Sequence, residues 1–95
     1  MNIKEVHTDT KEVSAKPLFQ SVEGTVTSLQ ILENGELKAH TTKVPALLVC
    51  VSGEVVFENE KGNKQILLNG DFVEIQPLVA HWILGVKNSH LLLFK

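Results

Sequence analysis

The sequence lacks the features that mark several large classes of protein. Its single cysteine, Cys50, excludes an internal disulfide. No apolar run approaches the roughly 20 residues that a membrane-spanning helix needs, so membrane insertion is not expected. No cluster of lysine or arginine is present to neutralise phosphates, and the net charge is −2, so we expect no nucleic acid as a partner.

Signals for export and for a second domain are also missing. Residues 1–7 contain no apolar core of the signal-peptide kind, which together with the lone cysteine favours a reducing, cytoplasmic location. Soluble domains typically hold about 100–150 residues, so the 95 residues are expected to form one domain, 1–95. With 43% hydrophobic and 21% charged residues, the composition is that of an ordinary folded protein.

No segment carries a sustained apolar stripe at helical spacing, so we expect little helix. Instead, short runs rich in valine, isoleucine, leucine and threonine recur roughly every ten residues, separated by turn signals such as Asn34-Gly35. This pattern indicates an all-β sandwich or barrel. The expected strands after the first turn are 25–32, 46–51, 54–58, 65–68, 71–75, 81–84 and 90–94.

The N-terminal stretch has a weaker pattern. Residues 3–16 alternate only faintly between apolar and polar and are rich in charge. We predict a short edge strand near Ile3–His7, followed by a solvated connection. On such a strand His7 faces solvent, and no role is assigned to it.

The segment from Gly70 to Trp82 reads as a strand, a tight corner and a returning strand. It begins with a Gly-Asp turn, places apolar residues at alternate positions up to Ile75, and breaks at Pro77. A second apolar run then begins at His81. The pattern therefore predicts an imidazole on a strand that directly follows a corner.

With His40 and His81 both on strands, the chain resembles the cupin family of small jelly-roll barrels. The first cupin motif is a glycine, a His-x-His pair, a glutamate and a second glycine. The second is a glycine, a Pro-x-Gly corner, a histidine and often an asparagine. The resemblance implies an all-β, cupin-like double-stranded β-helix, that is, a jelly-roll barrel, with its motif region at 35–85. The first motif aligns with Gly35, His40, Thr42, Ala46 and Gly53, and the second with Gly70, Asp71, Ile75, Gln76, Leu78, His81 and Gly85.

The metal-binding positions depart from the cupin pattern. Cupins that bind a metal usually do so with both histidines and the glutamate of the first motif and the histidine of the second. Here Thr42 and Ala46 replace a histidine and the glutamate, and Leu78 replaces the corner glycine. Of the usual ligands, only His40 and His81 remain.

The resemblance implies that His40 and His81 point into the barrel near each other. We interpret His40, Thr42 and His81 as ligand-binding residues for a small polar or anionic molecule. His40 and His81 are also the candidate metal ligands, and a divalent transition metal would need further donors, because catalytic sites usually have three protein ligands. Two close imidazoles in an apolar cavity resist protonation, so at least one should titrate below its ordinary pKa of about 6.5.

Cys50 and His90 are two further candidates for the site. Alternation points Cys50 inward, where we interpret it as core, because no Lys or Arg flanks it to activate the thiol. His90 falls on the last strand with Leu92 and Phe94, which favours packing over ligation. The sequence leaves open whether either residue joins the site.

Several strands are apolar on both faces, notably 46–51 and 91–94, and Trp82 must face away from His81. A barrel this small cannot cover both faces of several strands by itself. We therefore expect a homodimer joined through sheet faces. The alternative is that the N-terminal strand alone covers them.

These patterns favour a small-molecule-binding protein with its pocket inside the barrel and without a tightly held metal; no catalytic residue is assigned. One alternative, implied by the resemblance, is a metal-dependent enzyme of the dioxygenase or isomerase type that uses His40 and His81. A second alternative is a structural or regulatory dimer whose barrel is filled by side chains.

Overall fold

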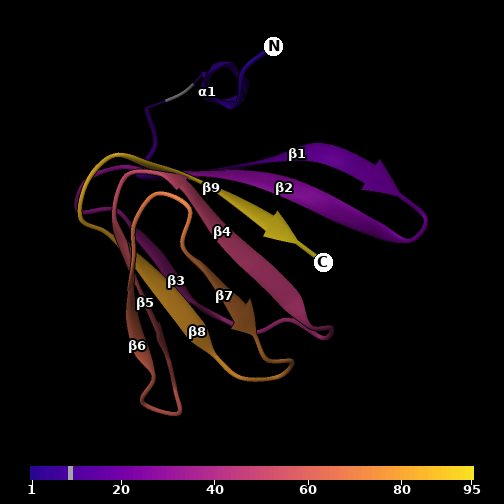
Figure 1. The fold of residues 1–95 in the computed structure, drawn as a ribbon, viewed down its shortest axis with the longest axis vertical. Helices are drawn as coiled ribbons and strands as arrows, with labels where there is room; N and C mark the ends of the chain where they lie inside the picture. Colours follow the sequence, from indigo (N-terminus) through magenta and orange to yellow (C-terminus); the bar gives the residue numbers. More distant parts are fainter. Residues whose placement is uncertain (9) are drawn as a thin grey trace.

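The computed structural model describes residues 1–8 and 10–95, and nearly all of their regular structure is β-strand (Figure 1). This confirms the prediction of an all-β chain with little helix. No helix in the described part is long and apolar enough to cross a membrane. The elements are α1 (Ile3–Val6), β1 (Val13–Ser21), β2 (Gly24–Ile31), β3 (Glu36–His40), β4 (Ala46–Ser52), β5 (Val55–Asn59), β6 (Lys64–Leu67), β7 (Phe72–Ile75), β8 (His81–Gly85) and β9 (Ser89–Phe94).

The strands form two antiparallel sheets that pack face to face as a jelly-roll sandwich. The five-stranded sheet has the order β1-β2-β9-β4-β7, and the four-stranded sheet has the order β3-β8-β5-β6. Strands that follow each other in sequence, such as β3 and β4 or β7 and β8, therefore lie in different sheets. This arrangement confirms the predicted fold class and brings strand ends that are far apart in sequence to the same end of the sandwich.

The core lies between the inner faces of the two sheets. In β4, Ala46, Leu48 and Cys50 point inward and are buried, whereas Leu47 and Val49 are half-buried on the other face. The same alternation runs along β8 and β9, where every second residue is buried. The buried cluster comprises Leu29, Ile31, Ala46, Leu48, Cys50, Val55, Phe57, Leu67, Ile75, Ile83, Leu91 and Leu93.

The prediction for the N-terminal stretch is wrong in two respects. Ile3–Val6 is a short helix rather than an edge strand, and the side chain of Asn2 caps it by accepting a hydrogen bond from the backbone N–H of Lys4 at 2.9 Å. His7 is buried rather than solvated, because its two ring nitrogens lie 2.9 Å from the hydroxyls of Ser14 and Ser28. These contacts hold α1 against the outer face of the five-stranded sheet.

The predicted solvated connection is also shorter than expected, because β1 already begins at Val13. From there β1 pairs with β2 along its whole length, with an irregularity between Pro17 and Phe19. Residues 17–21 are exposed, and Figure 1 shows the β1–β2 hairpin extending away from the sandwich. The alternation from Leu18 to the turn at Glu23-Gly24 predicts the outer half of this strand, and only its first half was assigned to the connection.

Gly53, the second glycine of the first motif, is required by both conformation and space. Its φ of +104° lies in the region that favours glycine. A Cβ at this position would meet the Ser89 hydroxyl and would lie 2.6 Å from the carbonyl oxygen of Asn88. Gly62 has a similar φ of +87°, but a Cβ there would meet nothing within 4 Å.

We predict that Gly53→Ala lowers the free energy of unfolding by about 2–4 kcal/mol, whereas Gly62→Ala lowers it by only about 1 kcal/mol. In both variants alanine must adopt an unfavourable positive φ, but only in Gly53→Ala does the added Cβ clash with neighbouring atoms. Urea unfolding followed by circular dichroism measures both values. Equal losses for the two variants would contradict the packing described for Gly53.

Candidate functional site

The end of β3 and the start of β8 bring two histidines together. His40 and His81 are partners in the antiparallel pairing of these strands, so their side chains leave the sheet side by side. Their ring centroids are 4.2 Å apart and the planes are tilted by 59°. The predicted convergence of the two rings is confirmed.

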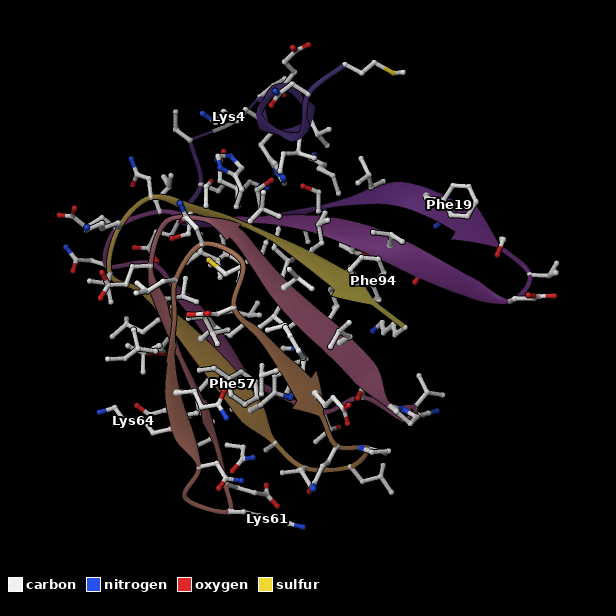
Figure 2. All side chains as sticks on the ribbon, in the orientation of Figure 1. Lys4, Phe19, Phe57, Lys61, Lys64 and Phe94 are labelled. Atoms are coloured by element: carbon white, nitrogen blue, oxygen red, sulfur yellow. The ribbon has the colours of Figure 1, made fainter. Side chains whose placement is uncertain are left out.

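The two rings differ in their exposure. His81 is 2% exposed and lies on the inner face of the four-stranded sheet, where its ring stacks on Phe57 of β5 with centroids 5.8 Å apart (Figure 2 labels Phe57). His40 is only half-buried. A small molecule would therefore reach the pair from the side of His40.

Backbone carbonyls set the orientation of both rings. Nδ1 of His40 lies 3.0 Å from the carbonyl oxygen of Lys38, and Nδ1 of His81 lies 3.4 Å from that of Val79. In the neutral rings Nδ1–H is then the donor, and Nε2 carries a lone pair. Among residues 1–8 and 10–95, no hydrogen bond satisfies Nε2 of either ring. A buried nitrogen without a partner calls for a group from outside the chain.

The surroundings of His81 disfavour its protonated form. Burial is the main cause that lowers the pKa of its imidazole, and the neighbouring ring of His40 lowers it further. The hydrogen bond to Val79 opposes this, and the positive charge of Lys95 adds to the lowering.

Thr42 is buried, but its hydroxyl is already engaged. Oγ1 donates to the carbonyl oxygen of Val44 at 2.8 Å and keeps only acceptor capacity for a ligand. The Thr42 carbonyl accepts the N–H of Leu78 at 2.8 Å. This bond ties the loop after β3 to the corner before β8, so residue 42 helps to fix the positions of both histidines.

The residues around the pair do not fit a metal held by protein ligands alone. Thr42 and Ala46 stand where the cupin pattern has a histidine and the glutamate, and neither threonine nor alanine supplies an imidazole or a carboxylate. In the described part of the chain, no group of three or more His, Cys, Asp or Glu side chains is arranged to hold a metal ion. Two imidazoles are one ligand short of the usual catalytic set.

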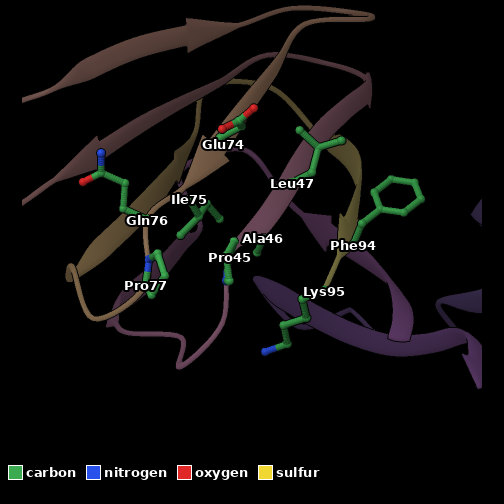
Figure 3. Close-up of a pocket in the computed structure, with 9 residues that line it drawn as sticks. All are labelled: Pro45, Ala46, Leu47, Glu74, Ile75, Gln76, Pro77, Phe94 and Lys95. Carbon is green, nitrogen blue, oxygen red and sulfur yellow. The ribbon is translucent and has the colours of Figure 1, made fainter. Parts of the chain in front are cut away.

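A hollow of about 540 Å³ lies where β4 begins and where β7 and β9 end (Figure 3). Its walls are mostly apolar, and Lys95, Glu74 and Gln76 add charged and polar groups. The lining residue Pro77 directly precedes Leu78, whose N–H binds the Thr42 carbonyl, so the hollow lies beside the corner before β8, while His40 and His81 are not among its lining residues. Sequence reasoning missed Lys95, because only the fold brings the end of β9 to this place. The lining residues are Pro45, Ala46, Leu47, Glu74, Ile75, Gln76, Pro77, Phe94 and Lys95.

Neither Cys50 nor His90 is brought to the imidazole pair. Cys50 is buried beside the Gly70–Asp71 turn, and burial, with the charge of Asp71, raises the pKa of its thiol. His90 lies on the outer face of the five-stranded sheet, where Nε2 is 3.1 Å from the side-chain oxygen of Gln30. The interpretation of both residues as packing rather than ligation agrees with these positions.

No family model matches the sequence, and no curated protein matches it either. Its fold is similar to that of a cupin superfamily protein from Desulfitobacterium hafniense, with a TM-score of 0.85, 16% identity and coverage of 98% of this chain and 84% of the other. It is also similar to the fold of an RmlC-like cupin from Shewanella frigidimarina, with a TM-score of 0.80, 18% identity and coverage of 87% of this chain and 74% of the other. A third similar structure is a protein of unknown function from Streptococcus pyogenes, with a TM-score of 0.83, 16% identity and coverage of 99% of this chain and 82% of the other. These likenesses show the fold and leave the activity open.

Leu78 takes the place of the corner glycine at a cost in conformation. Its φ is +63°, in the left-handed region, and its side chain is exposed. We predict that Leu78→Gly raises the free energy of unfolding by about 0.5–1 kcal/mol, because relief of the strained φ outweighs the added freedom of the unfolded chain. Leu68→Gly, at an exposed leucine without positive φ, is the control and should lower it. Calorimetric unfolding of both variants checks this, and a loss of stability in Leu78→Gly would refute the strain.

The lowered pKa of His81 has a consequence for stability. In the unfolded chain histidine titrates at about 6.5, so below this pH the unfolded chain binds more protons than the folded protein. We predict that the free energy of unfolding falls as the pH falls below about 6.5, and that the ring protons of His81 titrate with a midpoint below that value. His90, whose pKa is lowered by burial and by His7, contributes in the same direction. An NMR midpoint for His81 at or above 6.5 would contradict the burial of the pair.

Proposed function

We propose that this protein, which has the cupin fold, binds a small polar or anionic molecule at the imidazole pair of His40 and His81, with Thr42 as a third polar group. The observation that supports the proposal most is the buried Nε2 of His81, which has no hydrogen-bond partner in the described part of the chain. A ligand that donates a hydrogen bond there would remove the penalty of a buried, unsatisfied acceptor.

The charge around the pair favours an anionic ligand. Lys95 carries a positive charge that lowers the pKa of His81, and the same lysine lines the hollow at the start of β4. A carboxylate bound there would attract a proton to Nε2, which would then donate to the ligand instead of accepting. Binding of an anion should therefore be accompanied by proton uptake and by a rise in the pKa of His81.

A metal-dependent enzyme is the second candidate function. It is supported by the same two Nε2 lone pairs on adjacent rings, since neutral imidazoles are common metal ligands. The shortage of protein ligands means that water or a small carboxylate would have to complete the coordination. A structural or regulatory protein that binds no small molecule is the third candidate.

The proposed function is tested by adding acetate, succinate and inorganic phosphate in turn to the protein and following the histidine ring protons by NMR. We expect saturable shifts at His40 and His81 and a raised pKa for His81 with at least one probe. His81→Phe should abolish the response. His90→Gln, which changes a histidine on the outer face of the other sheet, is the matched control and should keep it.

The outcomes separate the three candidates. Absence of any saturable shift, or an unchanged response in His81→Phe, would contradict ligand binding at the pair and favour the structural reading. Stoichiometric metal found by elemental analysis, after purification without a nickel column, would favour the metal-dependent enzyme.

A further inference from the structure

We propose that His7 and His90 form an acid-sensitive latch, which holds the N-terminal segment (residues 1–8) on the outer face of the five-stranded sheet and releases it when both rings carry a proton. His90 lies on β9, on the opposite side of this sheet from the core. The imidazole pair of His40 and His81 belongs to the other sheet, so the latch does not depend on a ligand bound there.

Very little of the N-terminal segment is fixed by the rest of the chain. Helix α1 has four residues and buries none of them fully, and Figure 1 shows it lying outside the two sheets. A helix this short is not stable on its own in water. Among the described residues, the contacts of His7 with Ser14 and Ser28 are the only hydrogen bonds that join residues 1–8 to the sheet. The docking of the segment therefore depends largely on one imidazole.

The serine hydroxyls allow His7 to carry a proton without losing these contacts. Its Nδ1 and Nε2 each lie 2.9 Å from a hydroxyl oxygen, of Ser14 and Ser28 respectively. A neutral imidazole needs one donor and one acceptor, and an imidazolium needs two acceptors. Because a hydroxyl can donate or accept, both hydrogen bonds persist in either state. One proton at the latch is therefore compatible with a docked segment.

A second proton, on His90, is not compatible with docking. The rings of His7 and His90 are only 6.0 Å apart, and the ring of His90 is half-buried beside Gln30. Two positive charges at this distance repel each other, more strongly where water is partly excluded. Burial is the main cause that lowers the pKa of His90, and the charges of His7 and of Lys4 on α1 lower it further. Lys4 and His7 both belong to the segment, so its release removes both charges from His90.

The other charged groups around the latch do not offset this repulsion. Lys16 shares the face of β1 with Ser14, and it adds positive charge. The residue paired with His90 on β4 is the uncharged Ser52. In the described part of the chain, no carboxylate raises the pKa of His90. The acidic residues that precede β1 in the sequence are Glu5, Asp9 and Glu12.

Proton uptake is therefore linked to release of the segment. After release His90 titrates near the ordinary value of about 6.5, whereas in the docked state its pKa is lower. The released state then binds more protons below about pH 6.5, so the ratio of docked to released segment falls as the pH falls through this range. Release exposes Ser14 and Ser28 on the face of β1 and β2, and a rise in pH restores the docked segment.

Tryptic cleavage of the Lys4–Glu5 bond measures the release, because a protease cuts the segment only when it is undocked and extended. The rate is divided, at each pH, by the cleavage rate of a free peptide of residues 1–12, which removes the pH dependence of the protease. For the wild type we expect this relative rate to rise at least about threefold from about pH 8 to about pH 6.

Two variants identify the group responsible. In His90→Gln the amide can still contact Gln30 but cannot become charged, so the rise should disappear. His40→Gln is the matched control, because it removes a histidine from the other sheet, and it should show the same rise as the wild type. Far-UV circular dichroism at each pH checks that both variants are folded.

A relative rate that does not change with pH in the wild type would overturn the proposal, and so would an undiminished rise in folded His90→Gln. An NMR titration of the wild type gives a second test that needs no variant. The midpoint of the His90 ring protons should lie below about 6.5, and a midpoint at or above that value would rule out the latch.

Discussion

The antiparallel pairing of β3 with β8 is the constraint on which the candidate site depends. It makes His40 and His81 direct partners and leaves their rings 4.2 Å apart. Burial between the sheets then makes a charge on His81 unfavourable, and the carbonyls of Lys38 and Val79 turn both Nδ1 atoms toward the backbone. If this register shifted by one residue, one of the two rings would lie on the opposite face of the sheet, and the rings would no longer be in contact.

Most of the fold could be predicted because the strands after Gly24 alternate between apolar and polar residues and are separated by turn residues. The convergence of His40 and His81 followed from the motif resemblance rather than from periodicity, since residues 41 apart in sequence carry no local signal of contact. Lys95 could not be assigned to the site, because its place depends on how β9 ends beside β2 and β4. Long-range pairing is the information that local patterns do not hold.

The errors lie in the segment before Val13 and in the first hairpin. Ile3–Val6 has the alternation of a strand, but a cap from Asn2 and the absence of a strand partner among the described residues leave it helical. His7 was expected in solvent because its partners, Ser14 and Ser28, become neighbours only in the folded sheet. Residues 46–51 were expected to be covered on both faces because they are apolar throughout. In the structure only the inner face of this strand is buried, and the side chains of the outer face are half-buried or exposed.

The chain thus combines a cupin fold with two adjacent imidazoles, His40 and His81, whose Nε2 atoms have no hydrogen-bond partner in the described residues. Long-range ¹H–¹⁵N NMR of the histidine side chains at neutral pH tests this account most directly, because it reports which ring nitrogen carries the proton. The account predicts that His81 is protonated on Nδ1, with an unprotonated Nε2. A proton on Nε2 of His81 would contradict the account, because this nitrogen would then have no lone pair with which to accept a hydrogen bond from a ligand.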